Sequence, residues 1–374
     1  MLAESQTTVI DYASRQWWSR PDDERFLTLE DLHQHTRERS RESRVYTVPN
    51  KTLLARGSEN AGGALYLEHS ELGILEPNHW SLGQLARISH TPAAWLRELA
   101  TVPAGPAFAA HAVNLGLRHL AEFEDVQVLA GELSRPESSL LRCLVGPDYG
   151  RIYDDQVVFA VMDVNADGRW HVPAASYQAQ NPKRATTLYA SDRDVFIFLV
   201  DEQNPVSVKV GGTTRHLFRG FMVWNSEVGH QQFGFLTFLY DYVCDNRMVW
   251  GAREVKELRI KHTKNAPERF KREIRPLLRA YAEASVVDVE AQLARAARMK
   301  LGDTDEEVLT WLRSHDFTKR EGERIIELAK SEEGGARTVW EITNGGTALA
   351  RSIPHADERV KLERRMSRLL NQAA

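Results

Sequence analysis

Polar side chains that could do chemistry gather most densely just after residue 224. Asn225, Ser226 and Glu227 are followed by Gly229 and lie between two apolar runs, so they predict a turn at the tip of a hairpin. In such turns Asn and Ser side chains bond the local backbone, and Gly supplies a positive φ. The same side chains on a loop held by a rigid sheet could instead contact a phosphate or a base. The sequence leaves both interpretations open.

A metal site would require acidic and histidine side chains to converge, and the densest such group is Glu227, His230, Asp241 and Asp245. Their spacing fits no strong metal template, and the HExxH, Cys-x-x-Cys, EF-hand, Walker and GxGxxG patterns are missing. The sequence therefore predicts no catalytic residue, no metal ligand and no cofactor. A metal-dependent enzyme acting on nucleic acid or nucleotides, with Glu227, His230 and Asp245 near its site, stays open as an alternative.

The two cysteines, Cys143 and Cys244, are too few for a disulfide framework or a four-cysteine zinc site. No local signature links Cys244 to a histidine base, so we expect a small buried side chain there. The first residues match no signal peptide, and the longest apolar run, Val195 to Val200, is far shorter than the roughly 20 residues of a membrane span. These features predict a cytoplasmic protein without a membrane partner.

The formal net charge of -4 gives the chain no general attraction to nucleic acid. Between Arg253 and Arg279, however, ten Lys and Arg residues face four Glu residues. The preceding aromatic side chains are Phe235, Phe238, Tyr240, Tyr242 and Trp250. Cations that follow phosphates and rings that stack on bases are typical of single-strand binding, whereas core rings beside a solvated helix face would give the same pattern. The predicted phosphate contacts are Arg247, Lys256, Lys261, Lys264, Lys271 and Arg272.

Hydrophobic spacing predicts the elements that must position these residues. We expect a helix from about 28 to 44, two short helices in 81–99 with the outline of either a helix-turn-helix or ordinary scaffold, and a Pro/Gly/Ala-rich link at 101–110. Strands are expected from 126 onward, with a central strand at 194–201. A hairpin should span residues 215–236, with its second arm passing into a helix near Thr237.

Helix-start signals mark the last third of the chain. Asn265 and Pro267 predict a basic amphipathic helix, and capping boxes pair Thr304 with Glu307 and Thr318 with Glu321. The fold class is therefore α+β, a mainly antiparallel sheet flanked by helices and followed by a helical C-terminal third. The expected domains are 1–125, mixed and partly helical, 126–262, an α+β core, and 263–374, helical.

The segment from Arg219 to Gly251 resembles the phage/plasmid-like family catalogued as domain of unknown function 932. The family's turn and its Val-Cys-x-Asn element are matched by Asn225, Ser226, Glu227, Gly229, Val243, Cys244 and Asn246. Looser matches, at Tyr149 and around His262 among others, extend over most of residues 126–370. The resemblance implies an origin in a phage, prophage or plasmid, and no stated activity.

Together these patterns predict a DNA-related accessory protein that binds or anneals single-stranded DNA without catalysis. A sheet with a hairpin and following basic helices is similar in architecture to the annealing proteins that phages use in recombination, although a fold does not fix a function. A homo-oligomer is compatible with this role. A protein that binds a host factor through its helical C-terminal third is a third hypothesis.

Overall fold

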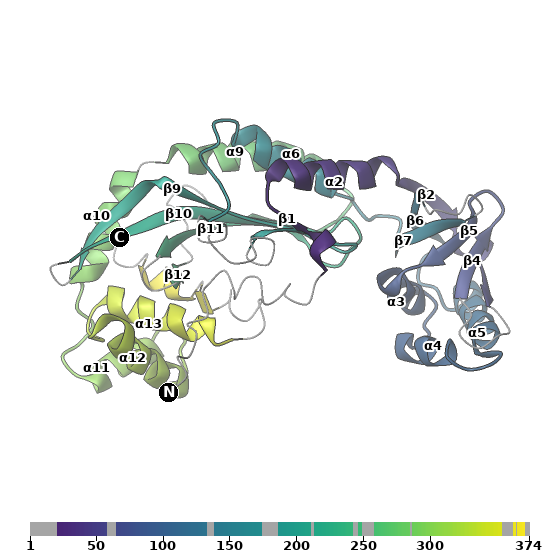
Figure 1. Ribbon diagram of the computed structural model, residues 1–374. Helices are drawn as coiled ribbons and strands as arrows, with labels where there is room; N and C mark the ends of the chain where they lie inside the picture. Colours follow the sequence, from purple (N-terminus) through teal and green to yellow (C-terminus); the bar gives the residue numbers. More distant parts are fainter. Residues whose placement is uncertain are drawn as a thin grey trace, which may run out of the picture.

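The computed structural model describes residues 21–57, 65–132, 138–173, 186–210, 213–241, 246–248, 258–284, 286–353, 362–363 and 365–370. Figure 1 shows two lobes, each built on its own sheet, with three helices along the upper edge of the larger lobe. Nearly all described strand pairs are antiparallel, and helices follow in the C-terminal part. The predicted α+β class is confirmed.

The smaller lobe contains a sheet of six described strands and three helices. In spatial order its strands are β2 (Arg44–Pro49), β6 (Asp125–Glu132), β7 (Ser138–Val145), β5 (Gly73–Pro77), β4 (Leu65–His69) and β3 (Leu54–Gly57). The prediction that strands begin at 126 is wrong, because β2 to β5 precede that point. The sheet joins strands from both sides of residue 126, since β2 pairs with β6 and β5 runs parallel to β7.

Three helices pack against this sheet: α3 (His79–Ile88), α4 (Ala93–Leu99) and α5 (Gly105–His119). The predicted pair of short helices in 81–99 is confirmed, and α3 serves as scaffold because Ser81 Oγ donates to the Leu141 carbonyl on β7 at 2.6 Å. The predicted link at 101–110 is wrong. Pro106 instead lies in the first turn of α5, where a missing N–H costs nothing, and the alanines that follow favour helix.

The larger sheet is a meander of long strands with short strands at its edges. Its path is β1 (Arg25–Phe26), β8 (Leu188–Ala190), β9 (Val195–Val210), β10 (Thr213–Asn225), β11 (Phe233–Asp241) and β12 (Asn246–Met248), and β13 (Leu258–Ile260) also pairs with β11. The predicted hairpin is confirmed, with Leu217 opposite Asp241. The predicted helix near Thr237 is wrong, because β11 continues as a strand to Asp241.

Helices α2 (Leu29–Arg41), α6 (Asp154–Val164) and α9 (Ala266–Glu283) cover one face of the larger sheet (Figure 1). Thr28 caps α2 by accepting from the Asp31 N–H at 3.1 Å. The predicted apolar face of α9 is buried, and its Phe270 ring meets the edge of the Phe233 ring of β11 with centroids 5.0 Å apart. The sheet and these helices therefore share one continuous core.

The C-terminal helices are α10 (Val286–Arg298), α11 (Asp305–Arg313), α12 (Lys319–Glu333) and α13 (Val339–Arg351). Both predicted capping boxes, at Thr304 and Thr318, are confirmed, and Thr338 forms a third. Arg215 of β10 pairs with Glu333 of α12 at 2.7 Å, which ties the helices to the sheet. None of the helices in the described part of the chain combines the length and apolar content of a transmembrane span.

Candidate functional site

The turn between β10 and β11 points its polar side chains into the protein. Asn225 and Ser226 are fully buried, and Glu227 is 2 % exposed. Asn225 Nδ2 donates to the Ile152 carbonyl at 2.8 Å and to Asp154 Oδ1 at 2.7 Å. Gly229 has a φ of 82°, a left-handed conformation that glycine adopts at little cost. The predicted turn is present, and its side chains bond to the protein instead of being displayed.

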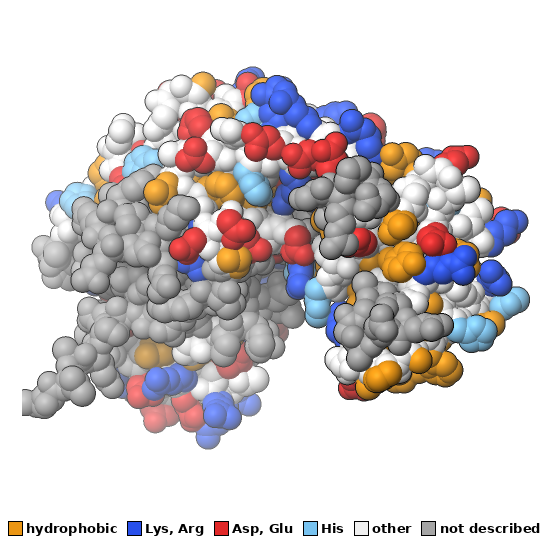
Figure 2. Space-filling model, turned by 45° about the vertical axis from the view of Figure 1, so that its right-hand side comes forward, with side chains coloured by type: hydrophobic (Ala, Val, Ile, Leu, Met, Phe, Trp, Pro, Cys, Tyr) orange, Lys and Arg blue, Asp and Glu red, His pale blue; other side chains and the backbone are white. Residues whose placement is uncertain are grey.

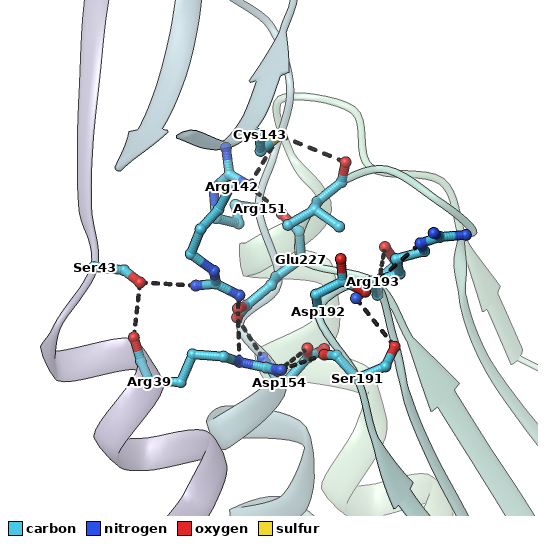
Figure 3. A network of polar contacts seen from close by, with 12 residues as sticks. Arg39, Ser43, Arg142, Cys143, Arg151, Asp154, Ser191, Asp192, Arg193 and Glu227 are labelled. Carbon is cyan, nitrogen blue, oxygen red and sulfur yellow. Dashed lines mark hydrogen bonds and ion pairs between the residues drawn. The ribbon is translucent and has the colours of Figure 1, made fainter. Parts of the chain in front are cut away.

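Glu227 lies at the centre of a network in which Arg39 and Arg142 contact its carboxylate, while Arg151 donates to its main-chain carbonyl (Figure 3). Arg142 of β7 donates to Glu227 Oε1, and Arg39 Nε of α2 lies 3.5 Å from the same oxygen. The Asp154 N–H at the start of α6 donates to Glu227 Oε2 at 3.2 Å. The carboxylate therefore joins the turn to both lobes and to two helices.

The two guanidinium groups are themselves held in place. Arg142 Nη1 donates to Ser43 Oγ at 2.7 Å, and the Ser43 hydroxyl donates to the Arg39 carbonyl at 2.7 Å. Arg39 Nη2 pairs with Asp154 Oδ2 at 2.8 Å. Because each charged group has several partners, the arrangement of the network is rigid.

The two buried carboxyls have opposite pKa shifts. Burial alone would raise the pKa of Glu227, but the charges of Arg142 and Arg39 and the hydrogen bonds outweigh it and lower this pKa to about 2. Burial and the neighbouring Glu227 carboxylate raise the pKa of Asp154 well above its usual value. Glu227 is therefore the ionised partner of the arginines at neutral pH.

Val228, the next residue of the turn, lies in the contact between the two lobes. Its carbonyl accepts from Trp80 Nε1 at 3.0 Å and from Gln84 Nε2 at 2.7 Å, both on α3. Its side chain packs with Leu129 and Cys143 of the smaller sheet. Cys143 is fully buried, and burial raises the pKa of its thiol, which disfavours the nucleophilic thiolate form.

Residues 261–265, which follow β13, form a turn that is hydrogen-bonded to Gly150. The Gly150 N–H donates to the His262 carbonyl at 3.2 Å, and His262 Nδ1 donates to the Gly150 carbonyl at 3.1 Å. The His262 and Tyr149 rings stack with centroids 5.0 Å apart, and Tyr149 OH donates to the Ser226 carbonyl at 2.9 Å. Tyr149 therefore links this cationic turn, residues 261–265, to the buried turn.

Four of the predicted phosphate contacts have described side chains. Lys261 and Lys264 are exposed on the cationic turn, and Lys271 and Arg272 are exposed on α9. Arg272 already pairs with Glu273 at 2.9 Å. Arg247 is opposite Tyr240 in the β11–β12 pair, and Lys256 lies outside the described residues.

The aromatic part of the predicted interface is wrong where it can be examined. Phe235 and Phe238 are fully buried on opposite faces of the larger sheet, so neither ring can stack on a base. Tyr242 and Trp250 lie outside the described residues, as does Cys244. Asn246 is the first residue of β12, opposite Asp241.

The described residues of the alternative metal site, Glu227 and His230, are not arranged to bind a metal ion together. The carboxylate of Glu227 is engaged by two guanidinium groups and a backbone N–H, as shown above. His230 is exposed, with its ring edge-on to Trp80 at a centroid distance of 4.9 Å, and Asp245 is outside the described residues. Within the described residues, no group of three or more His, Cys, Asp or Glu side chains could hold a metal ion.

Comparison with known proteins gave one match, to a family model. Neither the curated proteins nor the solved structures gave a match. Residues 174–351 match the model of a family described as Domain of unknown function (DUF932), and the match includes strands β8 to β13 and helices α9 to α13. The resemblance first noted in the Asn-Ser-Glu turn is thereby confirmed over residues 174–351, which are similar to the DUF932 family model.

Proposed function

We propose that the protein binds single-stranded DNA by stoichiometric contact with its phosphates. The observation that carries this proposal is a set of three exposed lysines, Lys261, Lys264 and Lys271, on and beside the cationic turn. Among the described residues, no carboxylate lies within 4 Å of any of the three ammonium groups. Their charges are therefore available to an anionic ligand.

The neighbouring arginines differ because each already approaches an acidic side chain, with two arginines sharing each carboxylate. Arg269 and Arg272 both pair with Glu273, at 3.0 and 2.9 Å. Arg275 and Arg279 both approach Asp163 of α6, at 3.4 and 3.7 Å. The three lysines therefore offer charge that no described carboxylate shares.

The turn that carries two of these lysines is held at both ends. Ile260 before it and Ala266 after it are each 1 % exposed, and His262 at its centre is bonded to Gly150. A ligand would meet cations whose backbone is already ordered, which lowers the entropy lost on binding. The turn also leads into the N-terminus of α9, where the helix dipole favours an anion.

The architecture agrees with this role. An antiparallel meander, β9 to β11, with α9 packed across it is similar to the sheet-and-helix core of phage annealing proteins, a likeness that concerns architecture alone. Origin in a phage, prophage or plasmid stays a prediction of the resemblance.

Fluorescence anisotropy of a labelled single-stranded oligonucleotide, with unlabelled duplex as competitor, tests the proposal. The double variant Lys261→Glu/Lys264→Glu should bind at least about 10-fold more weakly than wild type, because each reversal turns an attraction into a repulsion. Lys51→Glu/Lys319→Glu is the matched control, since it makes the same charge change at exposed sites elsewhere. No binding by wild type at low salt, or equal loss in both double variants, would overturn the proposal.

A further inference from the structure

The outer surface of α6 carries one large exposed ring. Phe159 is 48 % exposed, and it is the sole large apolar side chain exposed on α2, α6 or α9, each of which is described throughout. Its neighbours one turn away on the same helix face are Asp155 and Asp163. An exposed ring between two acidic positions is unusual on the solvent face of an amphipathic helix.

Core packing does not account for this ring. The inner face of α6 supplies Val157, Val158 and Val161, each at most 1 % exposed, to the core beneath the helix layer. Phe159 lies on the exposed side of α6, where its ring contacts His33 of α2 and Arg275 of α9. A small or polar side chain at this position would leave the core of α6 intact.

Two flat groups from the neighbouring helices pack against the ring. The imidazole of His33 on α2 stacks against Phe159 with ring centroids 5.7 Å apart and planes 30° apart. The guanidinium carbon of Arg275 on α9 lies 5.6 Å from the Phe159 centroid. Arg275 is kept there by Asp163, which its Nε approaches at 3.4 Å.

The ring also adjoins the proposed phosphate-binding residues. Arg275 follows Lys271 by four residues, so the two side chains lie on the same side of α9. In Figure 2, Lys and Arg side chains gather along the upper edge, where Figure 1 shows α2, α6 and α9, above a band of acidic side chains. An aromatic ring bordered by cations is the arrangement that single-strand binders use to stack bases.

We propose that the exposed part of the Phe159 ring is a stacking platform for an unpaired base of the bound strand, with His33 and Arg275 packed against the ring and fixing its orientation. The inference rests on the proposed function and adds the source of strand selectivity. In a duplex both faces of each base are covered by neighbouring bases, so only a single strand can present a base face to Phe159. The lysines then supply affinity for phosphate, and Phe159 distinguishes single strands from duplex.

The test compares a normal oligonucleotide with an abasic one of equal length, which keeps the phosphates and lacks the bases. Wild type should bind the normal strand about 5- to 10-fold more tightly, the lower part of the range for one stacked base. Phe159→Ala should bind both strands with the affinity that wild type has for the abasic strand. Phe159→Leu, which keeps apolar surface without a flat ring, should behave like Phe159→Ala.

The matched control is Phe108→Ala, since Phe108 is 60 % exposed on α5 in the smaller lobe. It should retain the full preference for the normal strand. Retention of that preference by Phe159→Ala, or its restoration by Phe159→Leu, would overturn the stacking role while leaving the phosphate contacts in place. Failure of wild type to bind either strand would instead overturn the proposed function as well.

Discussion

Replacing Glu227 by glutamine removes the one charge on which the arginine network converges, while keeping the shape of the side chain. The pKa of Glu227 is about 2 in the folded protein against 4.5 for the free group. Since each pH unit between the folded and unfolded pKa corresponds to about 1.4 kcal/mol, the ionised carboxylate contributes about 3 kcal/mol at neutral pH. In other proteins, removal of one partner from a buried ion pair costs about 3–5 kcal/mol, which agrees with this contribution.

Urea unfolding at pH 7 measures this loss directly, as the difference in the free energy of unfolding between wild type and Glu227→Gln. The matched control is Glu68→Gln, because Glu68 pairs with Arg56 at 2.8 Å on the surface, where the two side chains are 39 % and 52 % exposed. An exposed pair contributes less than about 1 kcal/mol. We therefore expect the buried substitution to cost roughly three times as much as the exposed one, or more.

The direction with pH follows from the same pKa. Because the folded pKa of Glu227 lies below the unfolded one, its contribution is complete above about pH 4.5 and is lost as the pH falls through about 2. The double variant Glu227→Gln/Arg142→Met should recover part of the loss, since it also removes a guanidinium left without its anion. A free energy of unfolding for Glu227→Gln within about 0.5 kcal/mol of wild type would refute the reasoning.

The remaining predictions concern the cationic turn. A Cβ at Gly150 would overlap the Thr263 carbonyl oxygen, so Gly150→Ala should displace the turn and weaken DNA binding in the anisotropy assay without any change of charge. Gly83→Ala is the control, since its Cβ would meet its nearest atom at 3.7 Å, and unaltered binding by Gly150→Ala would contradict a fixed turn. Burial lowers the pKa of His262 to about 4, below the unfolded value of 6.5, so its contribution is complete above about pH 6.5 and is lost as the pH falls through 4. Between pH 7 and 4 the free energy of unfolding of wild type should therefore fall by about 3 kcal/mol more than that of His262→Asn, as measured by unfolding curves. Equal losses in wild type and His262→Asn would contradict this assignment.

Local signals in the sequence predicted much of the fold. Thr304 and Thr318 were identified as helix starts because a capping box requires only four consecutive residues. The second arm of the hairpin was predicted wrongly because β11 is buried on both faces. Phe235 packs on one side and Leu236 on the other, so the strand has no polar alternation and its apolar spacing also fits a helix.

The arginine network could not be predicted, because its members lie far apart in the chain. Arg142 and Glu227 are 85 residues apart, and Arg39 and Asp154 are 115 apart. Charged residues are usually exposed, so each alone suggests a surface position. One available signal was Arg142 itself, which interrupts an apolar strand segment and would be costly to bury without a carboxylate partner.

The exposed lysines were predicted from the sequence as part of a longer basic segment. What the sequence could not show is that Asp163 and Glu273 pair with four of the arginines nearby, since one of these acids lies on a different helix. Phe159 was not singled out either, because it follows the apolar residues Val157 and Val158 and looks like one more core side chain.

The salt dependence of binding tests phosphate contact by the lysines most directly. For single strands, the slope of log affinity against log salt concentration is about -0.7 for each neutralised phosphate. Removal of two contacts in Lys261→Gln/Lys264→Gln should therefore make the slope shallower by about 1.4, whereas Lys51→Gln/Lys319→Gln should leave it unchanged. A slope that is the same in all three proteins would contradict the assignment of these lysines to the DNA phosphates.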